Sequence, residues 1–132
     1  MKVAELEGPL LNYWVAKAEG LRVEIRKRHT CERLYAYIFI NTAVVTGQPR
    51  IYLPASNWDE AGPIIERERI ILKPYGDGYW GAGYEFDHDA RGGMFYMNRS
   101  QEGETPLIAA MRAYVASRFG EEVEDIRPGS AG

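Results

Sequence analysis

The spacing of apolar residues predicts a helix at each end of the chain. Near the start, apolar residues recur at the i, i+3, i+4 and i+7 spacing of one helical face, and Gly20 follows them. These residues are Leu11, Trp14, Val15 and Ala18. Near the end, Thr105 and Pro106 suit the N-cap and the first helical position, and Gly120 suits a helix end. The pattern therefore predicts helices over residues 9–19 and over the segment between Thr105 and Gly120.

Between these helices, alternating apolar and polar residues predict strands. LRVEIR (21–26) alternates regularly, and LYAYIFI (34–40) is rich in aromatic and β-branched residues and is expected to be its antiparallel partner. Further strands are predicted at 50–53, in RIILK and in GYWGAGYEF, and residues 87–104 are expected to form a long irregular connection. We therefore predict a single α+β domain over residues 1–124, with a flexible tail over 125–132. Its antiparallel sheet of about five strands would pack against the N-terminal and the long C-terminal helix.

Composition and charge limit the class of protein and the compartment that we expect. The 132 residues carry a formal net charge of -3, which argues against a globally basic nucleic-acid-binding protein. The single cysteine, Cys31, cannot form an intramolecular disulfide, so a reducing compartment is expected. The first residues do not resemble a secretory signal, and the most apolar stretch is shorter than the roughly 18 residues a membrane span needs. We expect a cytoplasmic protein without membrane contact.

Three local patterns suggest chemistry but have simpler interpretations. GDGYWG (76–81) matches a dinucleotide-binding pattern, yet the residues after it favour a strand over a helix, so we predict a glycine-rich hairpin. Asp87, His88 and Asp89 are consecutive and cannot all face one metal, so a solvated turn is favoured. Cys31 lies near His29 in a basic loop without an orienting third group, and is expected to be an ordinary thiol. We expect no metal or cofactor.

The segment around the first predicted hairpin is locally basic. It carries Arg22, Arg26, Lys27, Arg28 and Arg33 against two glutamates, and Tyr35, Tyr37 and Phe39 follow. A basic loop beside aromatic side chains could hold single-stranded nucleic acid, with cations on phosphates and rings stacked on bases. The same spacing places the three aromatic residues on one strand face, where they could instead form part of the core. We favour the core interpretation and keep nucleic-acid binding as the alternative.

The stretch WDEAGPIIERERI (58–70) has the features of a helix start and of a charged site. Pro63 suits the first position of a short helix, which would turn Ile64 and Ile65 inward and pair Glu66 with Arg69 on the surface. The simplest interpretation is a helical turn that leads into a strand. Glu66 or Glu68 could also act as a base in a small hydrolase or transferase, although no nucleophile lies nearby in sequence.

Four blocks of the sequence resemble the NinX-like phage family. The blocks are MKVAELEGPLLNYWVAKAEGL, YLPASNW, GPIIERERI and TPLIAAMRAYVASRFGEEV. The resemblance implies an accessory protein of phages and prophages that is made in a bacterial cytoplasm and has an early role, and it assigns no reaction.

We therefore expect a non-catalytic module that binds an unknown phage or host protein. The candidate binding residues are Tyr52, Asn57, Trp58, Glu66, Arg67, Glu68 and Arg69. Nucleic acid bound through residues 22–33 is the alternative. The sequence leaves open the oligomeric state and whether Trp58 is buried or exposed.

Overall fold

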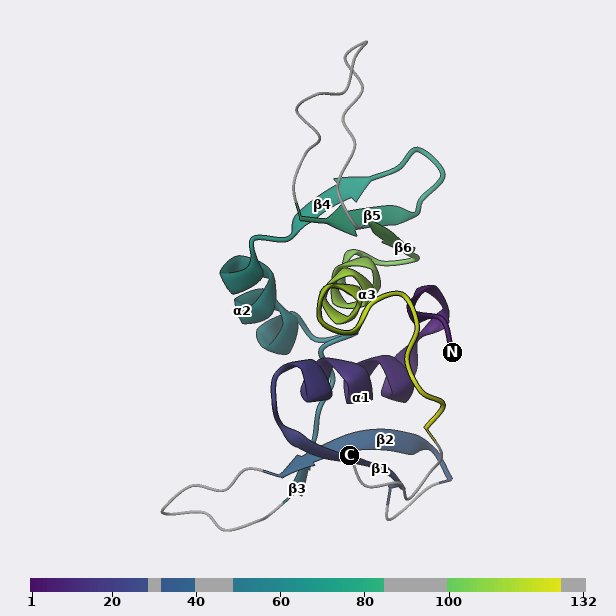
Figure 1. Ribbon diagram of the computed structural model, residues 1–132, viewed down its shortest axis with the longest axis vertical. Helices are drawn as coiled ribbons and strands as arrows, with labels where there is room; N and C mark the ends of the chain where they lie inside the picture. Colours follow the sequence, from purple (N-terminus) through teal and green to yellow (C-terminus); the bar gives the residue numbers. More distant parts are fainter. Residues whose placement is uncertain (29–31, 40–48, 85–99, 127–132) are drawn as a thin grey trace.

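The computed structural model describes residues 1–28, 32–39, 49–84 and 100–126, and its elements confirm the α+β class (Figure 1). In chain order they are η1 (Val3–Glu5), α1 (Gly8–Ala18), β1 (Arg22–Lys27), β2 (Leu34–Phe39), β3 (Pro49–Ile51), α2 (Trp58–Glu68), β4 (Ile71–Pro74), β5 (Trp80–Gly83), β6 (Gln101–Gly103) and α3 (Pro106–Phe119). The strands form two antiparallel sheets of three, β1-β2-β3 and β4-β5-β6.

The C-terminal helix α3 lies at the centre of the molecule. It contacts α1 and α2 and packs against all three strands of the second sheet, while α1 covers the first sheet (Figure 1). Alanines at 109, 110 and 113 are fully buried, as are Met111 and Val115, so both sides of α3 are packed closely against neighbours. Phe119 at the end of α3 is 41% exposed.

In place of the predicted single sheet of about five strands, the described residues form two sheets of three strands each. After β3 the chain runs through Pro54, which cannot donate to a ladder, and then through α2, so β4 begins a new sheet on the other side of α3. The sixth strand, β6, lies where we predicted an irregular connection. Its sequence QEG has no strand pattern, and β6 forms because it pairs with β5 and because Gly103 lets α3 approach closely.

The first sheet is fixed by the alternation in β1. Val23 and Ile25 pair with Ile38 and Ala36 of β2, and all four side chains are buried beneath α1. The predicted helix, strand and antiparallel pairing are therefore confirmed for this part of the chain. The side chain of Asn12 is the buried polar exception in α1, and its Oδ1 accepts a hydrogen bond of 2.8 Å from the backbone N–H of Ala55.

The helix α2 begins earlier than predicted. Asn57 is its N-cap, and the Asn57 Oδ1 accepts a hydrogen bond of 2.9 Å from the N–H of Asp59. Pro63 consequently lies inside the helix and not at its first position, so our prediction for Pro63 was wrong. The cap outweighs proline as a start signal here, because it satisfies a free N–H group whereas proline only fixes φ. Arg69 ends the helix in the left-handed conformation, with φ of 57°.

The connection between β4 and β5 is a hairpin, as predicted for GDGYWG. The N–H of Tyr75 donates to the carbonyl of Tyr79 at 2.8 Å, and Gly78 takes a positive φ of 91° that suits glycine. The segment does not open a helix, so it lacks the geometry of a dinucleotide loop. The predictions for residues 29, 31 and 87–89 lie outside the described residues.

Within the described ranges, no group of three or more potential metal ligands is brought together. Among the same residues, no helix is both long and apolar enough to cross a membrane.

Candidate functional site

The start of α2 and the segment before it hold three of the predicted binding residues in different environments. Tyr52 is only 5% exposed and belongs to the core, whereas Trp58 is 53% exposed at the helix start. Asn57 serves as the helix cap. The carboxylate of Glu60 fixes the approach to this turn, because it accepts a hydrogen bond of 2.5 Å from the N–H of Leu53 and pairs with the guanidinium of Arg50. Of the three predicted residues, Trp58 presents a large side chain to solvent.

The end of α2 joins a polar cluster that links the three α-helices. Arg67 donates two hydrogen bonds, of 3.1 and 2.7 Å, to the carboxylate of Glu19 at the end of α1. The hydroxyl of Tyr114 in α3 donates to the same carboxylate at 2.7 Å. Glu68 accepts from Arg67 at 3.1 Å and from Arg118 at 3.2 Å. We call these five residues the helix-joining cluster.

The electrostatics of this cluster favour the charged forms of Glu19 and Arg67. Burial raises the pKa of Glu19, but hydrogen bonds from Arg67 and Tyr114 outweigh it, and the net pKa lies below the usual value. Burial and the hydrogen bond to Glu19 raise the pKa of Tyr114 to about 12. Glu19 is therefore ionised and Tyr114 neutral near neutral pH. This arrangement holds the helices together, and the carboxylate of Glu19 already accepts hydrogen bonds from Arg67 and Tyr114.

Two predicted residues at the end of α2, Glu66 and Arg69, lie apart from the helix-joining cluster. Glu66 and Arg69 are exposed, and no ion pair joins them in the described part of the chain. The predicted Glu66–Arg69 pair is therefore not formed, because Arg69 has left the helical conformation. Arg67 and Glu68, by contrast, belong to the helix-joining cluster. Ile64 is buried and Ile65 half-buried, as the helical interpretation predicted.

The outward side of the first sheet combines aromatic and basic residues. The β1–β2 register places Arg22 opposite Phe39, Glu24 opposite Tyr37, and Arg26 opposite Tyr35. We call these six residues the outer face. In Figure 1 the described helices all lie on the other side of this sheet, and the strands β1 and β2 contact no described element besides α1, β3 and each other. No described element therefore covers the outer face.

The aromatic side chains on this face are half-buried, and arginines contribute to that cover. The guanidinium carbons of Arg22 and Arg26 lie 4.5 and 5.1 Å from the centre of the Phe39 ring. Arg28 lies 5.8 Å from the centre of the Tyr35 ring. Our favoured interpretation of Tyr35, Tyr37 and Phe39 as core residues was thus wrong. Both faces of β2 are apolar in sequence, and its pairing with β1 decides that Ala36 and Ile38 turn inward.

Glu24 is the acidic residue of the outer face. Its side chain is 17% exposed, and its carboxylate lies between Arg22, at 3.6 Å, and Arg26, at 2.5 Å. The other predicted basic residues are at the end of the hairpin. Lys27 is exposed and paired with Glu32 at 2.8 Å, and Arg33 is exposed. The structure therefore brings Arg22, Arg26 and Arg28 onto the aromatic surface, and leaves Lys27 and Arg33 beside it.

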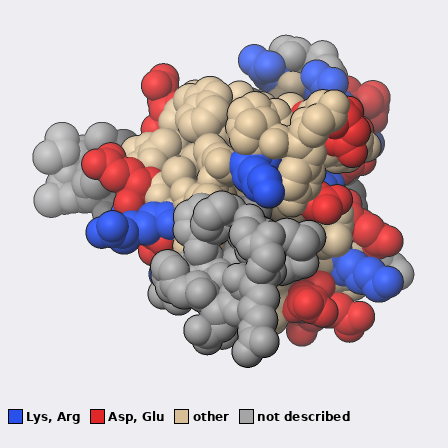
Figure 2. Space-filling model, turned by 90° about the horizontal axis from the view of Figure 1, so that it is seen from above, with Lys and Arg blue, Asp and Glu red and all other residues tan. Residues whose placement is uncertain are grey.

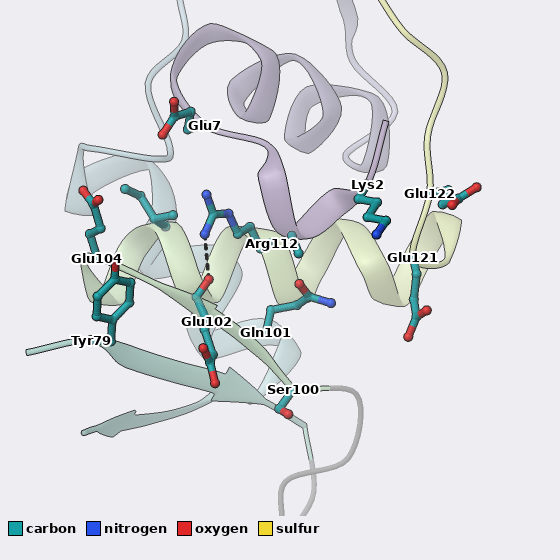
Figure 3. Close-up of a pocket in the computed structure, with 12 residues that line it drawn as sticks. Lys2, Glu7, Tyr79, Ser100, Gln101, Glu102, Glu104, Arg112, Glu121 and Glu122 are labelled. Atoms are coloured by element: carbon teal, nitrogen blue, oxygen red, sulfur yellow. Dashed lines mark hydrogen bonds between the residues drawn. The ribbon is translucent and has the colours of Figure 1, made fainter. Parts of the chain in front are cut away.

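A polar cleft of about 670 Å³ opens between η1, the start of α3 and β6 (Figure 3). Arg112 points into the cleft, donating to the carbonyl of Leu6 at 2.8 Å and to that of Glu102 at 2.7 Å. Burial lowers the pKa of Arg112, while the charges of Glu7 and Glu104 oppose this shift. Its backbone hydrogen bonds give Arg112 a structural role that joins α3 to η1 and β6. No sequence pattern singled out this arginine beyond its place in a predicted helix.

Figure 2 views the molecule from the end that carries β4–β6. Lysines, arginines, aspartates and glutamates are interspersed there, and the described residues form no continuous basic area in that view.

Residues 2–118 match the phage family described as "Bacteriophage P22, NinX". The chain belongs to this NinX family. The match covers η1, α1, α2, both sheets and all of α3 except Phe119, and it confirms the resemblance drawn from the four sequence blocks. A search of curated proteins finds no match to the chain. Membership of this family identifies a phage protein. Its candidate role is inferred from the geometry of the described residues.

Proposed function

We propose that this NinX-family chain is a non-catalytic phage accessory protein that binds a partner through the outer face of its first sheet. The observation that carries the proposal is a surface, covered by no described element, on which a row of three aromatic side chains in β2 lies beside two arginines in β1. Aromatic and arginine side chains dominate the energetics of binding surfaces, because they combine large contact areas with directed polar groups. The protein acts in the cytoplasm of the bacterial host.

The non-catalytic part of the proposal is supported by the location of the candidate bases. Glu68 is held by Arg67 and Arg118, with contacts of 3.1 and 3.2 Å. Glu66 is exposed on the surface of α2 and makes no described contact with a nucleophile. A general base needs a reacting group within hydrogen-bond reach. In the described part of the chain, no nucleophilic side chain takes that position beside either glutamate.

The test compares affinity capture by three forms of the tagged protein. Lysate from bacteria infected with a phage that encodes a NinX-family protein is passed over the wild type, an Arg22→Ala/Arg26→Ala/Tyr37→Ala variant, and a Lys2→Ala/Lys73→Ala control. The control also removes two exposed cations, but outside the outer face. Circular dichroism establishes that all three forms are folded. We expect a component that the wild type and the control retain and the outer-face variant loses. Retention that is the same for all three would refute the proposal.

A second candidate surface is the start of α2. Trp58 is 53% exposed, and a large aromatic side chain at such a position can anchor a protein partner. This alternative predicts that Trp58→Ala abolishes capture while the outer-face variant retains it. It includes Asn57 as the cap that holds the turn in place.

A further inference from the structure

We infer that the partner of the outer face is single-stranded nucleic acid. The inference rests on the proposed function, because it names the occupant of the same surface. The feature that points to it is the pairing, across β1 and β2, of two guanidinium groups with a row of aromatic rings. Guanidinium groups pair with phosphates and aromatic rings stack on bases, and single-stranded nucleic acid offers both along one chain.

The spacing of the rings suits an extended single strand. Tyr35, Tyr37 and Phe39 are alternate residues of one strand, so neighbouring side chains are separated by roughly 6.6 Å along it. Stacked bases in a duplex rise by only about 3.4 Å per nucleotide and expose no base face. A row of rings at this spacing can therefore stack with bases that have been spread apart, which is how single strands are commonly bound.

The charge on this part of the chain is opposite to that of the whole. The described residues of the β1–β2 hairpin include five arginines and lysines and two glutamates, whereas the whole chain has a net charge of -3. The two arginines nearest the rings remain accessible, with 64% of the Arg22 side chain and 44% of the Arg26 side chain exposed. This excess of positive charge favours a polyanion. It also disfavours a second copy of the same face, which would bring arginines against arginines.

Glu24 gives the inference a gain-of-function test. Its carboxylate occupies the position between Arg22 and Arg26 that a phosphate would take. Phosphate binding requires the two guanidinium groups to exchange this carboxylate for the ligand. Replacing the carboxylate with a neutral amide removes one negative charge from the surface while leaving a side chain of the same shape. Glu24→Gln should therefore tighten the binding of a single strand.

The experiment measures fluorescence anisotropy with a labelled oligodeoxythymidylate, an RNA of the same length and a matched duplex. Titrations run between about 50 and 200 mM salt, because phosphate contacts make affinity fall with salt. Wild type, Arg22→Ala/Arg26→Ala, Tyr37→Ala, Glu24→Gln and the Lys2→Ala/Lys73→Ala control are compared. We expect single strands to bind more tightly than duplex. The double arginine variant should reduce the salt slope by about two. Loss of the Tyr37 ring should weaken binding by roughly 5- to 150-fold.

The outcomes separate this inference from the proposed function. Single-strand binding that is weakened by the arginine and tyrosine variants, strengthened by Glu24→Gln and unchanged in the control would support it. Equal binding to duplex, or binding that the outer-face variants leave unchanged, would overturn it. Absent oligonucleotide binding would overturn it too. If lysate capture still depends on the outer face and survives nuclease in that case, the proposed function stands with a protein partner. If capture also ignores the outer face, both fail.

Discussion

Replacing Arg67 with methionine should destabilise the fold by breaking the helix-joining cluster. The methionine keeps an unbranched stem but removes the guanidinium that donates two hydrogen bonds to Glu19 and one to Glu68. Glu19 keeps its hydrogen bond from the Tyr114 hydroxyl, of 2.7 Å. The size of the effect depends on how much this partly exposed ion pair contributes to the free energy of unfolding.

The burial of the partners sets the expected magnitude. The side chain of Glu19 is 20% exposed and that of Arg67 is 49% exposed, so the pair lies between surface and interior. Surface pairs contribute about 0–1 kcal/mol, and breaking a buried pair costs about 3–5 kcal/mol. We therefore expect Arg67→Met to lower the free energy of unfolding by about 2 kcal/mol. At this chain length that corresponds to a fall in Tm of roughly 6–8 °C.

Urea unfolding followed by tryptophan fluorescence and circular dichroism measures this loss. Arg69→Met is the matched control, because it makes the same change two residues further along, at an exposed arginine without an ion pair in the described ranges. A double-mutant cycle with Glu19→Gln should give a coupling energy of about 1 kcal/mol or more. A loss within about 0.5 kcal/mol of the control, together with additive effects, would mean that the cluster does not hold the helices together.

Three further predictions concern stability. The pKa of Glu19 is lowered in the folded protein, so the contribution of its carboxylate to the free energy of unfolding is complete above the usual pKa of 4.5 and is lost as the pH falls below it. The pH dependence of Tm in this acid range should therefore be weaker in Glu19→Gln than in the wild type. Asn12→Ala should cost about 2 kcal/mol in urea unfolding, because the buried N–H of Ala55 loses its acceptor at 2.8 Å; a loss below about 0.5 kcal/mol would contradict this. Gly103→Ala should lower the free energy of unfolding by roughly 1–3 kcal/mol, because the new Cβ would lie 2.7 Å from a backbone nitrogen of α3. Thermal unfolding measures this loss, and Gly76→Ala, whose Cβ would meet no atom within 4 Å, is the control.

The parts of the fold that could be predicted are those where local signals agree. Thr105 accepts a hydrogen bond of 3.1 Å from the N–H of Ile108, which is the capping role its sequence position indicated. The regular alternation of β1 likewise predicts its buried face correctly, with Val23 and Ile25 inside. Such signals depend on a few neighbouring residues, and tertiary contacts reinforce them here.

The features that could not be predicted depend on contacts between distant segments. The three-residue strand β6 exists because β5 and α3 are already in place beside it, and its own residues carry no strand pattern. The orientation of β2 is similar, because Tyr37 and Ile38 are both plausible core residues until the register with β1 is known. For this reason the residues of the outer face were identified only as an alternative binding surface, and the favoured prediction placed the rings on the wrong side of the sheet.

The helix-joining cluster was hidden by sequence distance. Arg67 lies 48 residues from Glu19 and 47 from Tyr114, so no local pattern connects these side chains. The sequence assigned Arg67 and Glu68 to a possible binding surface because charged residues were concentrated there. The structure gives both residues partners on other helices, and their predicted role in binding remains to be tested by variants.

The central position of α3 has a consequence for synthesis on the ribosome. The second sheet packs against α3, and α1 contacts it on another side, yet α3 is the last helix of the described chain. Until residue 119 has been made, α1 and the β4–β5 hairpin lack the surface that joins them. The two sheets therefore cannot be brought into one core during most of translation, and contacts of large sequence separation complete folding. Nascent chains that stop before α3 should remain sensitive to protease, and chains that include it should become resistant in a single step.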